Sequence, residues 1–281
     1  MPELPEVETV RRGLAPFVVG RRIEKLQVLV PALRGPLDRT QLRRRLQGKT
    51  IVSAGRRGKY LLFGLDDGSG FILHLGMSGS CWMAAVGQAL RPHDHLVLEL
   101  SGGLSWRYND PRRFGCLQLC DSLESADLPA ALREMGPEPL EGEFTADYLF
   151  KASRGSARPV KTFLLDQAVV AGIGNIYASE TLWRAKVHPE QLAGSLTRRQ
   201  CAALVDHARA VLAEAVAAGG TTISDHRQPD GSEGGFSVNL AVYDRAGEPC
   251  QRCGKPVLRL VQSGRSTFFC PKCQPSRPRR S

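Results

Sequence analysis

The chain has 281 residues, and 38 basic against 28 acidic side chains give it a net charge of +10. Because 42% of its residues are apolar it can bury a core, which excludes general disorder, and no apolar run reaches the ~18 residues of a membrane helix. The N-terminal segment carries glutamates instead of a basic leader, so we expect a soluble, cytoplasmic protein without membrane contact. The positive net charge favours nucleic acid as the partner, because neutralising phosphates releases counterions. The alternative is a charge that serves solubility alone.

Short β-rich runs separated by Gly, Asp and Pro turns dominate the first 120 residues. A helix is predicted before them over residues 5–14, because Val7, Val10 and Leu14 share one side and glutamates lie in the first turn. A second helix is expected over residues 39–46. The expected strands cover residues 51–53, 60–65, 71–75, 96–100 and 116–119. This spacing predicts an antiparallel β-sandwich or barrel with flanking helices.

A change of composition marks the end of this first domain. Residues 122–143 are rich in Pro, Glu and Ser, and helices are predicted beyond them over residues 162–168, 175–185 and 197–218. Thr197 and Gln200 form a capping box for the last helix, and residues 221–236 are expected to be a long loop. We therefore expect a multidomain α+β protein. Its parts are a β-sandwich domain over residues 1–135, a linker, helical module and loop over 136–236, and a C-terminal module over 237–281.

Four of the eight cysteines form two close pairs near the C-terminus. Their C-x2-C spacing, with 16 residues between the pairs, is typical of a zinc site, and four thiolates leave no open position, so the metal would be structural. Two disulfides are the alternative, which a reducing cytoplasm disfavours. Residues 257–262 and 266–269 are predicted to pair as a hairpin, with Arg265 beside its tip. The Arg265 guanidinium is either solvated or presented to a phosphate. The expected ligands of one Zn²⁺, with no organic cofactor, are Cys250, Cys253, Cys270 and Cys273.

The N-terminus carries two glutamates, Glu3 and Glu6, which can be ordinary first-turn acids of the predicted helix. Met1 precedes the small residue Pro2, so its removal would leave a free prolyl amine that is partly neutral near pH 7 and can attack an electrophilic carbon. Glu3 is placed to shuttle the proton. Lys59 is a second candidate amine, with a solvated strand-end lysine as the alternative.

Three further motifs could contact phosphates or a metal. Residues 172–175 (GIGN) open a helix with exposed N–H groups, but they lack the third glycine and the βαβ unit of a dinucleotide fold. His93 and His95 have the spacing of a metal pair without an evident third ligand, which favours a structural or phosphate-contacting histidine. Residues 110–115 combine two arginines with a phenylalanine, as in a loop that touches bases and backbone or in a packed surface corner.

Six motifs follow one another along nearly the whole chain. They are MPELPEVETVR (residues 1–11), GKY (58–60), HLGMSG (74–79), DPRRFG (110–115), GIGNIYASE (172–180) and the two cysteine pairs. In this order they closely resemble the bacterial formamidopyrimidine-DNA glycosylases, within the wider family that includes endonuclease VIII. The endonuclease VIII branch shares the Pro-Glu start and the zinc finger but not the LPEVET sequence, so it is the alternative within that family.

The resemblance implies a bifunctional DNA repair enzyme that flips oxidised purines, chiefly 8-oxoguanine and formamidopyrimidines, out of duplex DNA and excises them. The same enzyme would then cut the abasic strand by β,δ-elimination. In the family's pattern Pro2 attacks C1′ and forms a Schiff base, Glu3 supplies the proton chemistry and Glu6 supports the site. Lys59 assists base release and β-elimination, and Arg265 holds a phosphate and assists δ-elimination.

The resemblance also implies a set of DNA contacts and a partner. Six residues would contact the DNA. His93, Lys161 and Asn175 would bind phosphates around the lesion, and Met77, Arg112 and Phe114 would fill the gap that the flipped nucleotide leaves. Arg112 would pair with the orphaned cytosine, and Asn175 would lie at the turn of a helix-two-turn-helix module. Residues 153–158 and 221–236 depart from typical family sequences. The resemblance therefore defines the type of reaction more closely than the range of lesions. The expected partner is damaged double-stranded DNA, bound by a monomer at the bacterial nucleoid.

A non-catalytic zinc-finger DNA-binding protein is the competing class, because the charge, the zinc site and the helices fit it equally well. The N-terminus separates the two classes, since a binder has no need of a free prolyl amine beside Glu3. A blocked N-terminus would leave binding intact but would abolish the Schiff base of an enzyme.

Overall fold

The computed structural model describes residues 2–124, 127–221 and 240–276. The chain divides into two compact units, the first formed by Met1–Glu134 with Ala218–Ser237 and the second by Met135–Ala217 with Val238–Ser281. The three-part division at residues 135 and 236 stays a prediction. Among the described residues, no helix combines the length and the apolar character that crossing a membrane requires.

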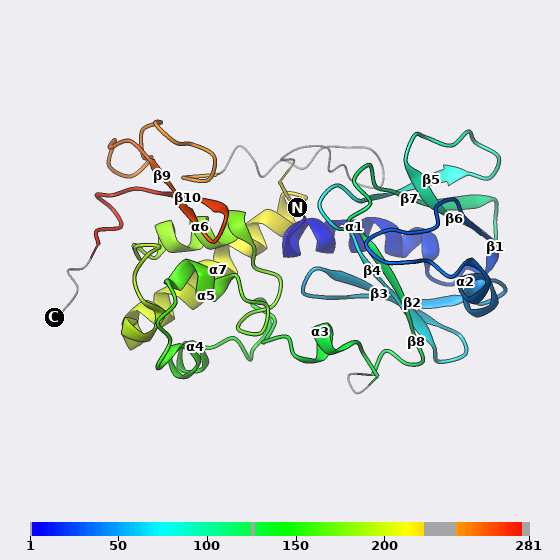
Figure 1. The fold of residues 1–281 in the computed structure, drawn as a ribbon, viewed down its shortest axis with the longest axis horizontal. Coiled ribbons are helices and arrows are strands. Elements are labelled where there is room, and N and C mark those ends of the chain that lie inside the picture. The colour runs from blue at the N-terminus through cyan, green and yellow to red at the C-terminus, as the bar shows by residue number, and fades with distance from the viewer. Residues whose placement is uncertain (1, 125–126, 222–239, 277–281) are drawn as a thin grey trace. The chain divides into compact units, whose positions relative to one another are not determined.

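Unit 1 contains two four-stranded antiparallel sheets (Figure 1). One sheet has the order β1-β6-β7-β5 and consists of β1 (Ile23–Val28), β5 (Ser80–Ala85), β6 (Asp94–Leu100) and β7 (Leu104–Asn109). The other has the order β2-β3-β4-β8 and consists of β2 (Ile51–Arg57), β3 (Tyr60–Leu65), β4 (Gly70–His74) and β8 (Cys116–Cys120). The predicted antiparallel sandwich is therefore confirmed, although β1, β5 and β7 were not predicted.

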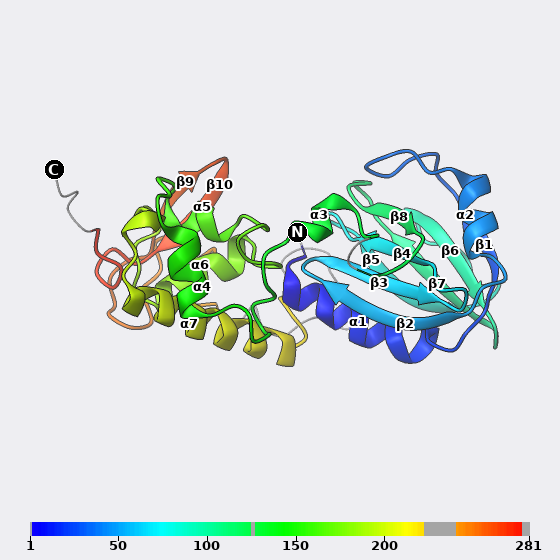
Figure 2. The same cartoon turned by 90° about the horizontal axis from the view of Figure 1, so that it is seen from below.

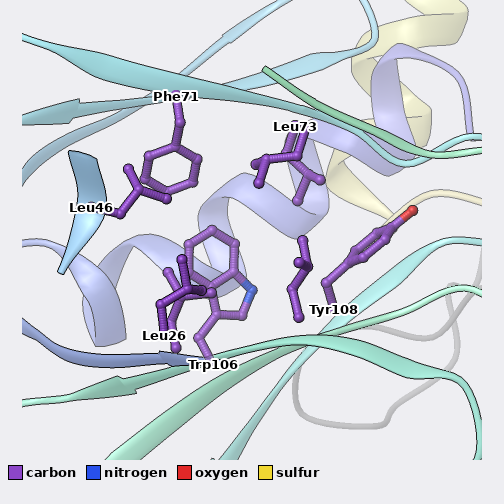
Figure 3. Close-up of a pocket in the computed structure, with 9 residues that line it drawn as sticks. Leu26, Leu46, Phe71, Leu73, Trp106 and Tyr108 are labelled. Atoms are coloured by element: carbon purple, nitrogen blue, oxygen red, sulfur yellow. The ribbon is translucent and has the colours of Figure 1, made fainter. Parts of the chain in front are cut away.

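The core of unit 1 lies between the two sheets. Phe71 and Leu73 of β4 point towards Leu26 of β1 and towards Trp106 and Tyr108 of β7 (Figure 3). Phe71 lies 5.9 Å from Trp106, measured between ring centroids. These side chains line a cavity of about 10 Å³, close to the space of a single water molecule. The cavity is therefore a packing gap in an apolar core and is too small for a ligand.

Two helices pack on this sandwich, α1 (Leu4–Val18) and α2 (Arg39–Leu46), and the short α3 (Ala130–Arg133) follows β8. Helix α1 continues beyond the predicted end at Leu14, because its buried stripe extends to Val18. Helix α2 has the predicted bounds, and its N-cap Asp38 accepts hydrogen bonds from the N–H groups of Thr40 and Gln41. The sequence pattern thus locates both helices and misses only the last turn of α1.

Unit 2 is built from helices and one hairpin. Its helices are α4 (Ala146–Ser153), α5 (Val160–Leu164), α6 (Asn175–Arg184) and α7 (Arg198–Ala217), with a 3₁₀ turn at Ala193–Ser195. Helix α7 packs against α4 and α6 (Figure 2). Its predicted capping box is confirmed, since Gln200 N donates to Thr197 Oγ1 at 3.2 Å and Thr197 N donates to Gln200 Oε1 at 3.1 Å. Helix α4 was not predicted, and α5 ends four residues before its predicted end at residue 168.

The hairpin consists of β9 (Leu258–Gln262) and β10 (Arg265–Phe269). Arg265 pairs with Gln262, so Ser263 and Gly264 form a two-residue turn, and the predicted hairpin is confirmed. Strand β10 lies beside α6. The hairpin therefore carries Arg265 at the first position after its turn.

Candidate active site

The first turn of α1 holds the predicted N-terminal residues of the site. Pro2 is buried directly before the helix, and Glu3 is its N-cap residue. The Glu3 N–H donates to Glu6 Oε2 at 2.9 Å, and only 2% of Glu3 and 3% of Glu6 is exposed. Both carboxyl groups are thus held at the N-terminal end of a helix, where the helix dipole stabilises negative charge.

Glu6 uses its second oxygen to hold a distant part of unit 1. Its Oε1 accepts hydrogen bonds from Thr221 N and Thr221 Oγ1, both at 2.9 Å. Thr221 is the first residue of the predicted long loop, and residues 222–236 of that loop lie outside the described residues. Glu6 therefore ties the start of α1 to the start of this segment.

Lys59 lies in the turn between β2 and β3. Arg57 pairs with Tyr60, so Gly58 and Lys59 form the two-residue loop, and Gly58 has the positive φ of +53° that the first position of such a turn requires. Arg56 Nη1 donates to the Gly58 carbonyl at 2.9 Å. Lys59 is only 7% exposed, which contradicts the alternative of a solvated strand-end lysine.

A cluster of charges joins α1 to this β2–β3 turn. Arg11 and Arg12 donate to Glu8, and the Arg56 guanidinium reaches the same carboxylate at 3.3 Å. Burial alone would raise the pKa of Glu8, but the hydrogen bonds from Arg11 and Arg12 outweigh it and lower this pKa to about 2. Because Arg56 also holds the turn, the helix that follows Pro2 and the turn that contains Lys59 share one ion-pair network.

A second group of predicted residues forms an exposed patch on unit 1. Met77 is 43% exposed and Phe114 is 42% exposed, and the Arg112 guanidinium lies 4.7 Å from the centroid of the Phe114 ring. His93 is exposed in a left-handed conformation with φ 70°, while His95 is buried and its Nε2 lies 2.8 Å from the Asp110 carbonyl oxygen. Exposed apolar groups beside a cation have the composition of a wedge for a base stack.

Three predicted residues of unit 2, Lys161, Asn175 and Arg265, lie at or beside the turn end of strand β10. Lys161 on α5 is fully buried, and its ammonium donates to Asn175 Oδ1 at 2.6 Å, Ser266 O at 3.0 Å and Thr267 Oγ1 at 2.7 Å. Asn175 Nδ2 also donates to Ser266 O, at 2.9 Å. Arg265 is exposed directly before these two pinned residues. The phosphate role of Lys161 stays a prediction.

The four C-terminal cysteines form a metal site. Their Sγ atoms all lie within 4.8 Å of one another, with Cys253 and Cys270 at 3.5 Å and Cys250 and Cys273 at 3.9 Å. A tetrahedral zinc with Zn–S bonds of about 2.3 Å separates its sulfurs by about 3.8 Å, so the four thiols fit one structural Zn²⁺. Among the described residues they are the only group of three or more side chains placed to hold a metal.

Helix α6 supports this zinc module with two side chains that were not predicted. Trp183 Nε1 donates to Cys250 Sγ at 3.4 Å, and although burial opposes it, this contact helps lower the pKa of Cys250 to about 6. The Glu180 carboxylate accepts hydrogen bonds from three consecutive backbone N–H groups, of Ala241, Val242 and Tyr243, at 2.9 to 3.0 Å. The only sequence signal for Glu180 was its place at the end of the GIGNIYASE motif.

Comparison with curated proteins decides the family. The chain is 48% identical over 282 residues to the formamidopyrimidine-DNA glycosylase of Rhodospirillum rubrum, and the match covers 98% of this chain and 100% of the relative. The chain belongs to the formamidopyrimidine-DNA glycosylase family. The family's protein from Edwardsiella ictaluri is 46% identical, with the same coverage.

Family models and solved structures agree with this assignment. The formamidopyrimidine-DNA glycosylase N-terminal domain matches residues 1–117, its H2TH (helix-two-turn-helix) domain matches 135–227, and a zinc finger found in Fpg and IleRS matches 247–275. The MutM (Fpg) protein of Thermus thermophilus has a TM-score of 0.87 and 44% identity, with coverage of 99% of this chain and 100% of that one. A Lactococcus lactis Fpg mutant in complex with Fapy-dG DNA has a TM-score of 0.90 and 38% identity, with coverage of 98% and 100%. The predicted resemblance, fold class and helix-two-turn-helix module are confirmed.

Proposed function

We propose that this protein excises oxidised purines, 8-oxoguanine and formamidopyrimidines, from duplex DNA and then cuts the abasic strand. The observation that carries the proposal is the full-length match to formamidopyrimidine-DNA glycosylases together with a Pro2-Glu3 start held at the head of α1. A mutant of the Lactococcus lactis Fpg binds Fapy-dG DNA in one solved structure, and the Lactococcus lactis Fpg binds abasic-site DNA in another. Damaged double-stranded DNA is therefore the partner that we assign.

The reaction begins at the N-terminus. The Pro2 amine attacks C1′ of the flipped nucleotide, the C1′–N9 bond breaks and the damaged base leaves with a proton. Glu3 donates a proton to the ring oxygen as the sugar opens to the Schiff base. Loss of a C2′ proton then expels the 3′ phosphate by β-elimination, with Lys59 assisting, and Arg265 holds the phosphate that leaves in δ-elimination. Water then hydrolyses the iminium, which releases the unsaturated sugar fragment and restores the Pro2 amine, and a one-nucleotide gap with phosphorylated ends remains.

The remaining predicted residues bind DNA or hold the site. His93, Lys161 and Asn175 contact phosphates, while Met77, Arg112 and Phe114 fill the gap, with Arg112 on the orphaned cytosine. Glu6 supports the N-terminus through the bonds described above. The enzyme acts as a monomer in the bacterial cytoplasm, at the nucleoid, and its single zinc has a structural role.

Borohydride trapping tests the proposal. Protein with a processed N-terminus is incubated with duplex DNA that contains 8-oxoguanine opposite cytosine, and the reduced adduct is mapped by mass spectrometry. We expect an adduct on Pro2 and none in a protein whose N-terminus is blocked by an uncleaved tag. Trapping only on an oxidised pyrimidine would indicate an endonuclease VIII-like specificity, and binding without any adduct would leave a zinc-finger DNA-binding protein.

A further inference from the structure

The three gap-filling residues stand on two separate loops of unit 1. Met77 lies in residues 75–79, after β4, whereas Arg112 and Phe114 lie in residues 110–115, after β7. All three side chains are exposed, and the Arg112 guanidinium contacts the Phe114 ring within one of the loops. Their relative positions therefore depend on how the two loops are joined beneath them.

The carboxylate of Asp110 joins the two loops. Asp110 is 0% exposed, and its Oδ1 accepts a hydrogen bond from Ser78 Oγ at 2.7 Å, next to Met77. Its Oδ2 accepts from Gly115 N at 2.8 Å, next to Phe114, and from the Tyr108 hydroxyl at 3.0 Å. Ser78 Oγ in turn accepts from Arg112 N at 3.3 Å. One buried anion thus holds Ser78 beside Met77 and Gly115 beside Phe114, and through Ser78 it holds the backbone of Arg112.

The backbone of Asp110 is fixed as well. Its N–H donates to the His93 carbonyl at 3.0 Å, and its carbonyl oxygen lies 2.8 Å from His95 Nε2. Burial, followed by the nearby Asp110 carboxylate, raises the pKa of Tyr108, so its hydroxyl stays a protonated donor to that carboxylate. Hydrogen bonds therefore hold both the backbone of Asp110 and the donors to its carboxylate in place.

The two loops also touch through their backbones. A Cβ atom placed on Gly76 would lie 2.5 Å from both Gly115 N and the Phe114 carbonyl carbon, and Gly76 has a φ of +73°. No side chain fits between the loops at this point, which brings the Met77 and Phe114 backbones close together. His74 Nδ1 accepts from Gly76 N at 3.0 Å and orients the same turn.

We propose that Asp110 is a positioning residue that makes residues 75–79 and 110–115 one rigid support, so that Met77, Arg112 and Phe114 enter the base stack together. This inference rests on the proposed function. Filling the gap is needed only when a base is flipped out of a duplex, and it is not needed when an abasic sugar in a single strand meets Pro2. Loss of the support should therefore separate two activities of the same enzyme.

The test is the ratio of two rates: excision of 8-oxoguanine opposite cytosine in a duplex, and cleavage of an abasic site in single-stranded DNA. For Asp110→Asn we expect the ratio to fall about 10- to 100-fold, the loss that a misplacement of about 1 Å produces. Ser78→Ala should lower it by a smaller factor, since it removes one bond to the same carboxylate. A 2-aminopurine beside the lesion should lose its fluorescence rise on binding, because that rise reports unstacking by the wedge.

Leu98→Val is the matched control, because Leu98 is a buried core residue of the same unit outside both loops. This variant should lose stability and keep the ratio within about twofold, which separates misplacement from partial unfolding. An Asp110→Asn protein that folds and keeps both the wild-type ratio and the fluorescence rise would refute the inference. If Asp110→Asn fails to fold, an unchanged ratio in Ser78→Ala would do the same. Inactivity of the wild-type protein on both substrates would instead count against the proposed function.

Discussion

The two units hold their functional side chains with buried charges of opposite sign. In unit 1 the anions Glu6 and Asp110 collect N–H and O–H donors from the N-terminus and from two loops. In unit 2 the cation Lys161 collects oxygens from α6 and from strand β10. The difference follows from the groups at each place, because Glu3, Gly115 and Thr221 present N–H groups to the anions, whereas Asn175, Ser266 and Thr267 present oxygens to Lys161. In both cases the functional residue is the neighbour of a pinned one.

Removal of zinc should have the largest effect, because it should destabilise the hairpin of unit 2 and leave unit 1 unchanged. A structural zinc contributes about 10 kcal/mol, so a chelator should unfold the hairpin and leave Lys161 without its partners in β10. Hydrogen exchange should show loss of protection over residues 258–269 and unchanged protection in the sheets of unit 1. Re-addition of zinc should restore the hairpin. A hairpin that stays protected without metal would contradict the assignment of the four cysteines.

Lys161→Met should have the next largest effect. It removes three charge-assisted hydrogen bonds from a buried site, so the unfolding free energy should fall by about 3 kcal/mol in urea titration. Because Arg265 would lose its fixed neighbours, the products should shift from β,δ- towards β-elimination on gels. Lys151→Met, at an exposed lysine of α4, is the control and should change neither quantity. A normal product pattern in a folded Lys161→Met protein would show that Arg265 needs no such support.

Glu6→Gln tests the anion at the N-terminus. An amide cannot accept on both sides, so the hydrogen bond from either Glu3 N or Thr221 N is lost, and we expect a stability loss of about 2 kcal/mol. The rate of borohydride trapping at Pro2 should fall with it. Glu24→Gln, at an exposed glutamate of β1, should leave trapping unchanged. Equal trapping rates in the two variants would remove Glu6 from the support of the site.

The pH dependence of stability should give the smallest effect. Burial, followed by the nearby Arg34 and Lys59 charges, lowers the pKa of His74 from 6.5 to about 4. The unfolded chain therefore takes up this proton first, and stability present above pH 6.5 is lost as the pH falls towards 4. The expected loss from this group is about 1 kcal/mol between pH ~7 and ~5.5, measured by thermal unfolding. His74→Asn keeps an acceptor for Gly76 N without titrating, so a slope identical to wild type would exclude His74 as its source.

Local patterns predicted the parts of the fold that depend on neighbouring residues. The β9–β10 hairpin, the cysteine pairs, helix α2 and the Thr197–Gln200 box were all visible as spacing along the chain. Strand β7 was missed because Arg107, which is 2% exposed, occupies a buried strand position where an apolar residue is expected. Its partners, the carbonyl groups of Gln88 and Ala89, belong to another loop. Tertiary hydrogen bonds of this kind leave no periodic signal.

In the candidate site, too, local motifs were visible in the sequence and long-range contacts were not. The sequence named Pro2, Glu3 and Lys59 through motifs, and it could not show that Lys59 is buried in its turn. The partners of Lys161 in β10 lie more than 100 residues away, so its burial could not be read from the segment around it. Asp110 was visible only as part of a loop motif, and its three donors come from both gap-filling loops and from β7. Roles that depend on long-range polar contacts need the folded structure.

The hydrogen bond from Trp183 to Cys250 gives the protein an internal optical probe. Of the three tryptophans, Trp82 and Trp106 belong to unit 1, and only Trp183 touches a metal ligand. A thiolate beside an indole quenches its emission, and the Arg252 guanidinium lies 4.1 Å from the centroid of the same ring. We therefore expect the ultraviolet fluorescence of the unlabelled protein to change with the occupancy of the zinc site, against a background from Trp82 and Trp106.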